Sequence, residues 1–370
     1  MIVGIPKEIK NHESRISMLP FGVEDLVKSG HQVIIESSAG IGSGFSDELY
    51  ANSGAQIANS AQEVYQRSDL IVKVKEPQES EYPLIKPGQM MFTFFHFAAD
   101  EKLLGSVIKS GLTAVAYETV QDNDGKLPLL IPMSEVAGRL AVINGSKCLE
   151  SNMGGKGKLI SGVSGVEAAN VLVLGGGIVG KNAAKLASGL GAKVNILDVN
   201  PDRLRYLNDI LPSNVVTLYS NSHNISDLLP KTDLLIGAVL IVGAKAPNLV
   251  TRDMLQYMDK KSVIVDVAVD QGGCVETCKP TTHENPTYEV DGITHYCVAN
   301  MPGAVPYTST LALSNSTFKY VYKLANSNLR NNLSDIHELR SGVNIYKGNI
   351  THQAVANSFD LKYSSLDSLL

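Results

Sequence analysis

Four polar residues of this 370-residue chain stand beside apolar segments, and their types suit acid–base and carbonyl chemistry. Lys75 follows the run LIVKV, His96 follows MMFTFF, Asp270 follows SVIVDVAV, and Arg15 lies in the polar segment NHESR. A guanidinium or an ammonium binds carboxylate and carbonyl oxygens, whereas imidazole and carboxylate groups exchange protons. Each residue also has a purely structural explanation. Arg15 and Lys75 could be solvated, His96 could be a hydrogen-bonded core residue, and Asp270 could be the acid of a turn.

The elements that must position these residues alternate along the first part of the chain. The runs IVGI, HQVIIE, LIVKV, MMFTFF and LTAVAY predict buried strands, and the segments FGVEDLVKSG and SDELYANSG between them predict helices. Open α/β sheets bind ligands beyond the carboxyl ends of their strands, where the candidate residues stand. This part of the chain therefore predicts a doubly wound domain that lacks a phosphate-binding motif.

A dinucleotide-binding motif lies near the middle of the chain. The apolar run NVLVL is followed by Gly175, Gly177 and Gly180 at the G-x-G-x-x-G spacing, and then by KNAAKLASGLGA, which reads as a helix. The next apolar run, VNIL, ends in Asp198, close to the spacing of about 20 residues that is typical of a ribose-binding acid. The free N–H groups at the start of the helix would hold a pyrophosphate. The alternative is an ordinary β–α–β turn with a surface aspartate.

The acid at position 198 favours NAD over NADP. A carboxylate accepts hydrogen bonds from the ribose hydroxyls and repels a 2′-phosphate. Arg203 weakens this preference, because a guanidinium could pair with that phosphate. The sequence therefore predicts NAD as the cofactor.

Composition narrows the class of protein. With 44% hydrophobic and 19% charged residues, the chain suits a globular protein of about two domains. Its net charge of −5 and the lack of a Lys/Arg-rich block argue against a surface that binds nucleic acid. No apolar run reaches the roughly 20 residues that span a membrane, and Lys7 and Glu8 interrupt any signal sequence. Four cysteines without a C-x-x-C pair indicate reduced thiols in a cytoplasmic protein.

The expected fold class is α/β, with two doubly wound Rossmann-like domains. The turn-like segment QDNDGKLP marks a boundary, so residues 1–128 and 307–370 would form a discontinuous substrate domain and residues 129–306 an inserted NAD-binding domain. A long helix starting near Ser134 would connect them. In the second domain the strands continue as VVTLY, DLLIGAVL, SVIVDVAV and THYCVA. The run LALSNSTFKYVYKLAN and the remaining C-terminal helices would pack back on the first domain.

Seven motifs, in order, resemble those of the alanine dehydrogenase family: NHESR, KVKEP, TFFHFAAD, PMSEVAGR, VLGGGIVGKNAA, VDVAVDQGG and HYCVANMPGAVP. The resemblance runs from residue 1 to about residue 313. It implies an NAD-dependent amino-acid dehydrogenase that interconverts L-alanine with pyruvate and ammonium, usually as a homohexamer.

The resemblance also implies roles for individual residues. Arg15 and Lys75 would bind the substrate carboxylate and carbonyl, and His96 and Asp270 would be the catalytic acid/base residues. A larger set would surround NAD, beside the motif glycines: Ser134, Ile178, Val179, Asp198, Arg203, Ser220, Val239, Leu240, Val267, Ala268, Val269, Asp270, Val298, Ala299, Asn300 and Met301.

Two positions depart from the family pattern, and two other readings stay open. Phe94 stands where relatives often carry tyrosine, and Tyr307 stands where arginine is common. A metal site is not expected, because His283-Glu284 lacks the second histidine of H-E-x-x-H. The alternatives are a relative of the NAD-binding subunit of proton-pumping transhydrogenase and a non-catalytic NAD-binding protein. The sequence does not fix how His96 and Asp270 divide the proton transfers.

Overall fold

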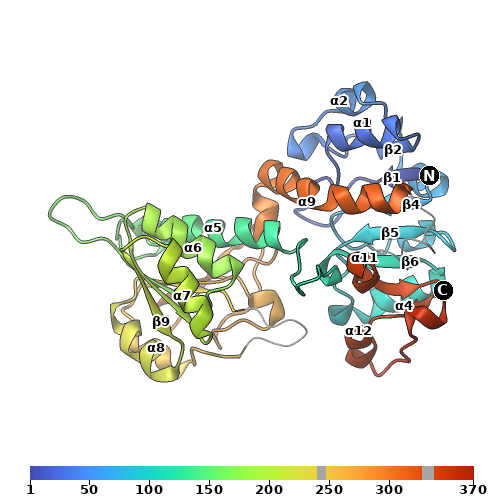
Figure 1. Ribbon diagram of the computed structural model, residues 1–370. Coiled ribbons are helices and arrows are strands. Elements are labelled where there is room, and N and C mark those ends of the chain that lie inside the picture. The colour runs from blue at the N-terminus through green and yellow to red at the C-terminus, as the bar shows by residue number, and fades with distance from the viewer. Residues whose placement is uncertain (240–246, 327–336) are drawn as a thin grey trace. The chain divides into compact units, whose positions relative to one another are not determined.

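The computed structural model describes residues 1–239, 247–326 and 337–370, which form two compact units. The first unit comprises Met1–Met133 and Val305–Leu370, and the second comprises Ser134–Ala304. The first unit is therefore discontinuous in sequence. Each unit is an α/β fold built around one mostly parallel sheet (Figure 1), which confirms the expected fold class.

The sheet of the first unit has eight strands in the order β15-β14-β6-β5-β4-β1-β2-β3. The strands β1 to β6 pair in parallel, β14 pairs antiparallel with β6, and β15 pairs antiparallel with β14. The strand bounds are β1 Ile2–Ile5, β2 Gln32–Glu36, β3 Gln56–Ala58, β4 Leu70–Val72, β5 Met90–Thr93, β6 Thr113–Ala116, β14 Val343–Tyr346 and β15 Asn349–Ile350. The order reverses between β1 and β4, and such a reversal opens a crevice at the carboxyl ends of the strands.

Helices cover both faces of this sheet. Buried side chains of α1 and α9 share one core with Val3 and Phe92, and those of α3 and α4 share the other core with Ile34 and Met91. Strands that are buried on both faces read as continuous apolar runs, which is why the sequence reveals them. The helix bounds are α1 Pro20–Lys28, α2 Asp47–Asn52, α3 Ala61–Arg67, α4 Glu101–Ser110, α9 Pro306–Asn326, α11 His337–Gly342 and α12 Gln353–Ser358.

The sheet of the second unit has seven strands in the order β12-β13-β11-β10-β7-β8-β9. Every pair is parallel except β12 with β13. The bounds are β7 Asn170–Leu174, β8 Lys193–Asp198, β9 Val215–Tyr219, β10 Leu234–Gly237, β11 Val263–Asp266, β12 Thr287–Val290 and β13 Ile293–Tyr296. The order from β9 to β13 is the dinucleotide-binding order, with the reversal between β7 and β10.

Close helix packing surrounds the central strands of this unit. The helix bounds are α5 Ile131–Cys148, α6 Ile178–Gly189, α7 Pro201–Ile210 and α8 Ser222–Leu228. A Cβ atom at Gly145 of α5 would lie 2.6 Å from a methyl carbon of Leu234, so glycine lets this helix approach the sheet. One at Gly138 would lie 2.3 Å from the carbonyl oxygen of Val179, where α5 meets α6.

Two expectations about local structure are wrong. The sequence predicts only helices in the C-terminal segment, but besides α11 and α12 this segment contributes β14 and β15 to the first sheet. The segment SVIVDVAV was expected to be one strand ending before Asp270, but β11 ends at Asp266. The Asp266 carboxylate accepts hydrogen bonds from the backbone N–H groups of Ala268, Cys274 and Val275. These bonds turn the chain into a short 3-10 helix, Val269–Gln271, that carries Asp270.

Candidate active site

Three of the predicted residues lie on loops that leave neighbouring strands of the first unit. Arg15 is on the loop after β1, Lys75 on the loop after β4, and His96 directly after β5 and Phe94-Phe95. The strands β5, β4 and β1 are adjacent and parallel, so these loops leave the same edge of the sheet. This edge is where the strand order reverses, the usual place of a ligand site in an α/β sheet.

Arg15 is held in a fixed position by a buried carboxylate. Its side chain is only 2% exposed, so the solvated alternative is wrong. Its Nε atom donates to Glu13 Oε1 over 2.6 Å, and its Nη2 atom pairs with Glu13 Oε2. Its Nη1 atom lies 3.0 Å from the sulfur of Met133. A two-pronged pairing of this kind fixes the plane of the guanidinium.

The loop that carries Lys75 is held by Glu8. One carboxylate oxygen of Glu8 accepts hydrogen bonds from the backbone N–H groups of Val74 (2.6 Å) and Lys75 (3.2 Å). The other oxygen lies 3.1 Å from the ammonium nitrogen of Lys73, which also donates to Glu81 over 3.0 Å. These acidic and basic side chains are buried, and burial raises the pKa of Glu8. A buried charge of this kind requires a partner, so the network ties β1 and β4 together at the site.

The surroundings of Lys75 lower the pKa of its ammonium group. Burial lowers the pKa of this ammonium, and the positive charge of Arg15 lowers it further. The negative charge of Glu76 acts in the opposite direction, but the net pKa shift is downward. A lysine with a lowered pKa donates a proton more readily than a solvated one. The positive charges of Arg15 and Lys75 are therefore close enough to interact.

His96 presents its ring to solvent from a constrained backbone. Its φ angle is +52°, and its backbone N–H donates to Glu118 over 2.6 Å. The ring stacks on Phe94 with centroids 5.7 Å apart, and its Nδ1 atom lies 3.9 Å from a carboxylate oxygen of Glu76. The side chain is 47% exposed, so the alternative of a core histidine is wrong. A left-handed backbone at a non-glycine residue is costly and is often found at functional sites.

Glu76 is strongly acidic in this setting. Burial by itself would raise its pKa, but the nearby His96 ring and the hydrogen bond from Lys10 outweigh burial and lower the pKa to about 2. The carboxylate therefore stays ionised at neutral pH beside the imidazole. A carboxylate beside a histidine stabilises the protonated ring and orients it.

A pocket of about 370 Å³ lies beside Arg15. Arg15 lines this pocket, whereas Lys75 and His96 do not. The other lining residues come from the loops after β1 and β2: Lys7, Glu8, Glu13, Ser14, Ser38, Ala39, Ile41 and Gly42. The pocket is large enough for a three-carbon acid, and Arg15 is one of its lining residues.

The glycine motif of the second unit has the geometry that a dinucleotide needs. Gly175 has a φ angle of +98°, which allows the tight turn after β7. A Cβ atom at Gly180 would lie 1.8 Å from the carbonyl oxygen of Gly175, so only glycine fits there. A Cβ atom at Gly177 would meet no atom within 4 Å, which leaves open space at the start of α6. The N-terminal N–H groups of this 12-residue helix favour an anion in that space.

Asp198 and Arg203 both bind the glycine loop. One carboxylate oxygen of Asp198 accepts from the N–H of Gly176 over 2.7 Å, and the other accepts from Asn200 over 2.9 Å. The Nε atom of Arg203 donates to the carbonyl oxygen of Gly176 over 2.5 Å, and Nη2 donates to that of Gly177 over 3.3 Å. The guanidinium of Arg203 is therefore engaged by the loop. This geometry favours an unphosphorylated ribose beside Asp198.

The other residues expected around NAD follow the carboxyl ends of the strands in the second unit or lie on α5. Ser220 follows β9 and donates its backbone N–H to the carbonyl oxygen of Asp198 over 2.9 Å. Val239 follows β10, and Leu240 lies outside the described residues. Ser134 lies in the first turn of α5. Those placed after β11 are Val267, Ala268, Val269 and Asp270, and those placed after β13 are Val298, Ala299, Asn300 and Met301.

The segment after β13 has a distinctive backbone. Asn300 has a φ angle of +60°, and the Nε2 atom of His283 lies 3.3 Å from its carbonyl oxygen. Asp270, in the 3-10 helix after β11, is exposed. Its carboxylate is therefore available to a ligand.

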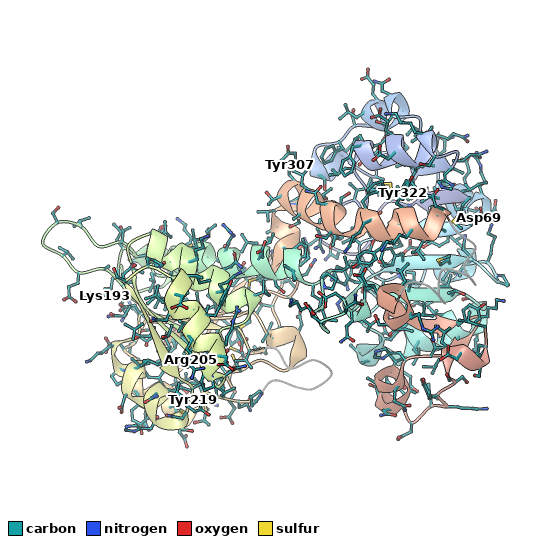
Figure 2. All side chains as sticks on the ribbon, in the orientation of Figure 1. Asp69, Lys193, Arg205, Tyr219, Tyr307 and Tyr322 are labelled. Atoms are coloured by element: carbon teal, nitrogen blue, oxygen red, sulfur yellow. The ribbon has the colours of Figure 1, made fainter. Side chains whose placement is uncertain are left out.

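The two departures from the family pattern occupy different settings. Phe94 is buried and packs edge-to-face on Tyr117, with centroids 5.0 Å apart. Tyr307 lies near the start of α9 (Figure 2). Its side chain is 58% exposed and stacks on Phe45 with ring centroids 5.9 Å apart. Phe94 is the departure that touches the ring of His96.

Sequence reasoning missed the carboxylates that hold the candidate residues. Glu13 holds Arg15, Glu8 holds the backbone of Lys75, and Glu76 and Glu118 hold His96. Two of them were visible as acids inside the motifs NHESR and KVKEP. The pairing of these acids with the candidate residues was not visible, because adjacent letters do not reveal which side chains are buried together.

Comparison with known proteins identifies the family. Residues 4–137 match the model of the alanine dehydrogenase/PNT N-terminal domain, and residues 141–353 match that of the C-terminal domain. The chain belongs to the alanine dehydrogenase/PNT family. It is 51% identical over 371 residues to an alanine dehydrogenase of Methanococcus maripaludis, with 100% of both chains covered. It is 50% identical to an alanine dehydrogenase of Bacillus subtilis, covering 100% of this chain and 98% of the relative.

Solved structures of this family have the same fold. An L-alanine dehydrogenase superposes with a TM-score of 0.94 at 51% identity, covering 97% of this chain and 99% of the other. A transhydrogenase from Sinorhizobium meliloti superposes with a TM-score of 0.80 at 25% identity, covering 96% and 100%. Among the described residues, no helix is long and apolar enough to cross a membrane. The same residues contain no group of three or more histidine, cysteine or acidic side chains that could hold a metal ion.

Proposed function

We propose that this protein is an NAD-dependent alanine dehydrogenase that interconverts L-alanine with pyruvate and ammonium. The observation that carries the proposal is the identity of about 50% with alanine dehydrogenases along the full length of the chain. Alignment over both units matters, because the cofactor motif lies in one unit and Arg15, Lys75 and His96 lie in the other.

NAD is the proposed cofactor. Bound NAD would supply hydride transfer to and from the substrate carbon. The open space at Gly177 and the start of α6 would hold the pyrophosphate. Asp198 would accept hydrogen bonds from the ribose hydroxyls while it keeps the hydrogen bond from the N–H of Gly176.

Substrate binding is assigned to Arg15 and Lys75. Arg15 would take the carboxylate of alanine or pyruvate, because Glu13 already fixes its guanidinium. Lys75 would hydrogen-bond the carbonyl oxygen of pyruvate and stabilise negative charge that develops on it. The lowered pKa of Lys75 follows from burial and from the nearby charge of Arg15, and it makes the ammonium a good proton donor.

Proton transfer is assigned to His96 and Asp270. Oxidation of alanine at its α-carbon gives an imine, to which water must add before ammonia leaves. His96 would take the proton from that water and return one to the departing nitrogen, with Glu76 supporting the protonated ring. Asp270, exposed after β11, would orient the amine or ammonia.

Steady-state assays test the proposal. The purified protein should form NADH from L-alanine and NAD⁺, and consume NADH with pyruvate and ammonium. His96→Ala or Asp270→Asn should lower kcat by about a hundredfold or more while NADH binding is retained. His223→Ala, which removes an exposed histidine of α8, is the matched control and should keep wild-type turnover. Wild-type turnover of the His96 or Asp270 variant would show that the assigned roles are wrong.

A second candidate function is favoured by the structural match to a transhydrogenase. A protein of that kind would bind NADH but would not turn over alanine. NADH binding without turnover of any amino or oxo acid in a panel would support that candidate, or a non-catalytic NAD-binding role, against ours. We also propose a homohexameric assembly, as in the family, which light scattering of the purified protein would test.

A further inference from the structure

Three of the four cysteines lie close to the segments proposed to bind NAD. Cys274 and Cys278 follow the 3-10 helix that carries Asp270, and Cys297 directly precedes the segment 298–301. All three are free thiols. Cys274 and Cys297 are buried, whereas Cys278 is partly exposed. The proposed reaction uses none of them.

The hydroxyl of Tyr288 brings two of these thiols together. It donates to the carbonyl oxygen of Thr277 over 2.9 Å and accepts from the backbone N–H of Lys279 over 2.7 Å. These two residues flank Cys278. The same hydroxyl lies 3.7 Å from the sulfur of Cys297. Tyr288 therefore fixes the backbone on both sides of Cys278 while touching the side chain of Cys297.

Backbone pairing supports the same proximity. The N–H of Thr281 donates to the carbonyl oxygen of Cys297 over 2.9 Å, and the N–H of Ala299 donates to Thr281 over 3.1 Å. The neighbouring thiol of Cys278 lowers the pKa of Cys297. The neighbouring Cys297 and burial both raise the pKa of Cys278. Cys297 is therefore the member of the pair that ionises more readily, and the thiolate is the reactive form of a cysteine.

We propose that Cys278 and Cys297 form a redox-active dithiol that hydrogen peroxide converts into a disulfide. One thiolate attacks the peroxide, the O–O bond breaks, and a sulfenic acid and hydroxide form. The second sulfur then displaces hydroxide from the sulfenic acid, which forms the S–S bond. The two thiol protons leave with the two oxygens as two water molecules. The sulfurs are oxidised by two electrons, and the peroxide is reduced.

The disulfide would connect the segment after β11 to the residue that precedes 298–301. We expect it to restrict that segment and to weaken NADH binding by about fivefold or more, the lower range of coupling between two sites. The expected loss of NADH affinity rests on the proposed cofactor site. Formation of the disulfide does not depend on that site.

Peptide mapping tests the pairing without any activity assay. The protein is treated with hydrogen peroxide, the remaining thiols are alkylated, and the chain is cut with trypsin and a glutamate-specific protease. Cleavage after Lys261, Glu276, Glu284, Glu289 and Lys319 puts the three thiols on separate peptides, 262–276, 277–284 and 290–319. We expect 277–284 linked to 290–319, with the mass lowered by two hydrogen atoms, and Cys148 and Cys274 alkylated.

Variants and NADH titration complete the test. Cys278→Ser and Cys297→Ser should each abolish the linked peptide and make NADH affinity insensitive to peroxide, whereas Cys148→Ser should behave like the wild type. Sulfinic or sulfonic acids without a linked peptide, or a disulfide that involves Cys274, would overturn the proposal that Cys278 and Cys297 form a disulfide. An unchanged NADH affinity in fully disulfide-bonded protein would overturn its effect on the cofactor site. A protein that binds no NADH in either state would contradict the proposed function and leave the peptide map as an independent result.

Discussion

The glycines of α6 allow structural and ligand-binding roles to be separated within one helix. Gly180→Ala would put a Cβ atom 1.8 Å from the carbonyl oxygen of Gly175, and both atoms belong to the backbone. Gly177→Ala would put one in open space at the start of the helix. Gly189→Ala, at the exposed end of the helix, would also meet no atom within 4 Å. The same chemical change is therefore made at three sites with different surroundings.

The three substitutions are expected to change different quantities, stability in one case and NADH affinity in another. Gly180→Ala should lower the free energy of unfolding by about 1–3 kcal/mol, the usual cost of overpacking. At about 2–4 °C per kcal/mol for a unit of this size, Tm should fall by about 2–12 °C. Gly177→Ala should change stability by less than about 1 kcal/mol. Its methyl group would occupy the place of the pyrophosphate, so NADH affinity should fall by about tenfold or more, which is about 1.4 kcal/mol. Gly189→Ala should add about 0.5–1 kcal/mol to stability.

Two measurements separate the packing role of Gly180 from the ligand-binding role proposed for Gly177. Thermal unfolding gives Tm, and the fluorescence of bound NADH gives Kd for each variant. Gly189→Ala is the control that should bind NADH with wild-type affinity. If Gly177→Ala binds NADH as tightly as the wild type, the pyrophosphate does not lie against this part of the helix. Wild-type stability of Gly180→Ala would refute the packing argument.

Three further perturbations test other parts of the structure. Glu13→Gln leaves the buried guanidinium of Arg15 without its ionised partner, so pyruvate KM should rise and the unfolding free energy should fall by about 3 kcal/mol; an unchanged KM and urea midpoint would refute this. Asp198→Ala removes the acceptor of the Gly176 N–H and the proposed ribose-binding carboxylate, so NADH affinity should fall more than NADPH affinity in parallel titrations. An equal loss of both affinities would contradict the proposed role of Asp198. Although burial would raise the pKa of Asp233, hydrogen bonds from two lysines and from the N–H of Asn170 lower it below the ordinary 3.8. This carboxylate therefore stabilises the fold above about pH 4, and the contribution disappears as the pH falls through the lowered pKa. Asp233→Asn should cost about 2 kcal/mol in urea unfolding at pH 7, the scale of hydrogen bonds to a charged group, and progressively less as the pH falls below about 4, whereas a constant difference would exclude the linkage.

The sequence predicts the parallel strands well for a physical reason. A strand that is buried on both faces must be apolar throughout, so β1, β5 and β7 are legible as short runs of letters. The glycine motif is equally legible, because the close approach at Gly180 allows no other residue. Features that depend only on residues close together in the sequence can therefore be predicted from the sequence.

Features that depend on distant partners could not be predicted in this way. The strand β14 exists because Val343 and Ile345 pair with β6, which lies more than 200 residues earlier. The end of β11 is set by the carboxylate of Asp266, which binds N–H groups up to Val275. The carboxylates that hold Arg15 and His96 escaped notice for the same reason, since their importance comes from burial rather than from spacing.

The late position of β14 has a consequence for synthesis on the ribosome. Translation delivers β1 to β6 first, then the whole of Ser134–Ala304, and only at the end the helix α9 and the strand that covers the edge of β6. The inserted unit can complete its sheet while the earlier one still has an open strand edge, and open edges promote aggregation. A nascent chain stalled before residue 343 should therefore require chaperone protection, although the inserted unit it carries is already complete.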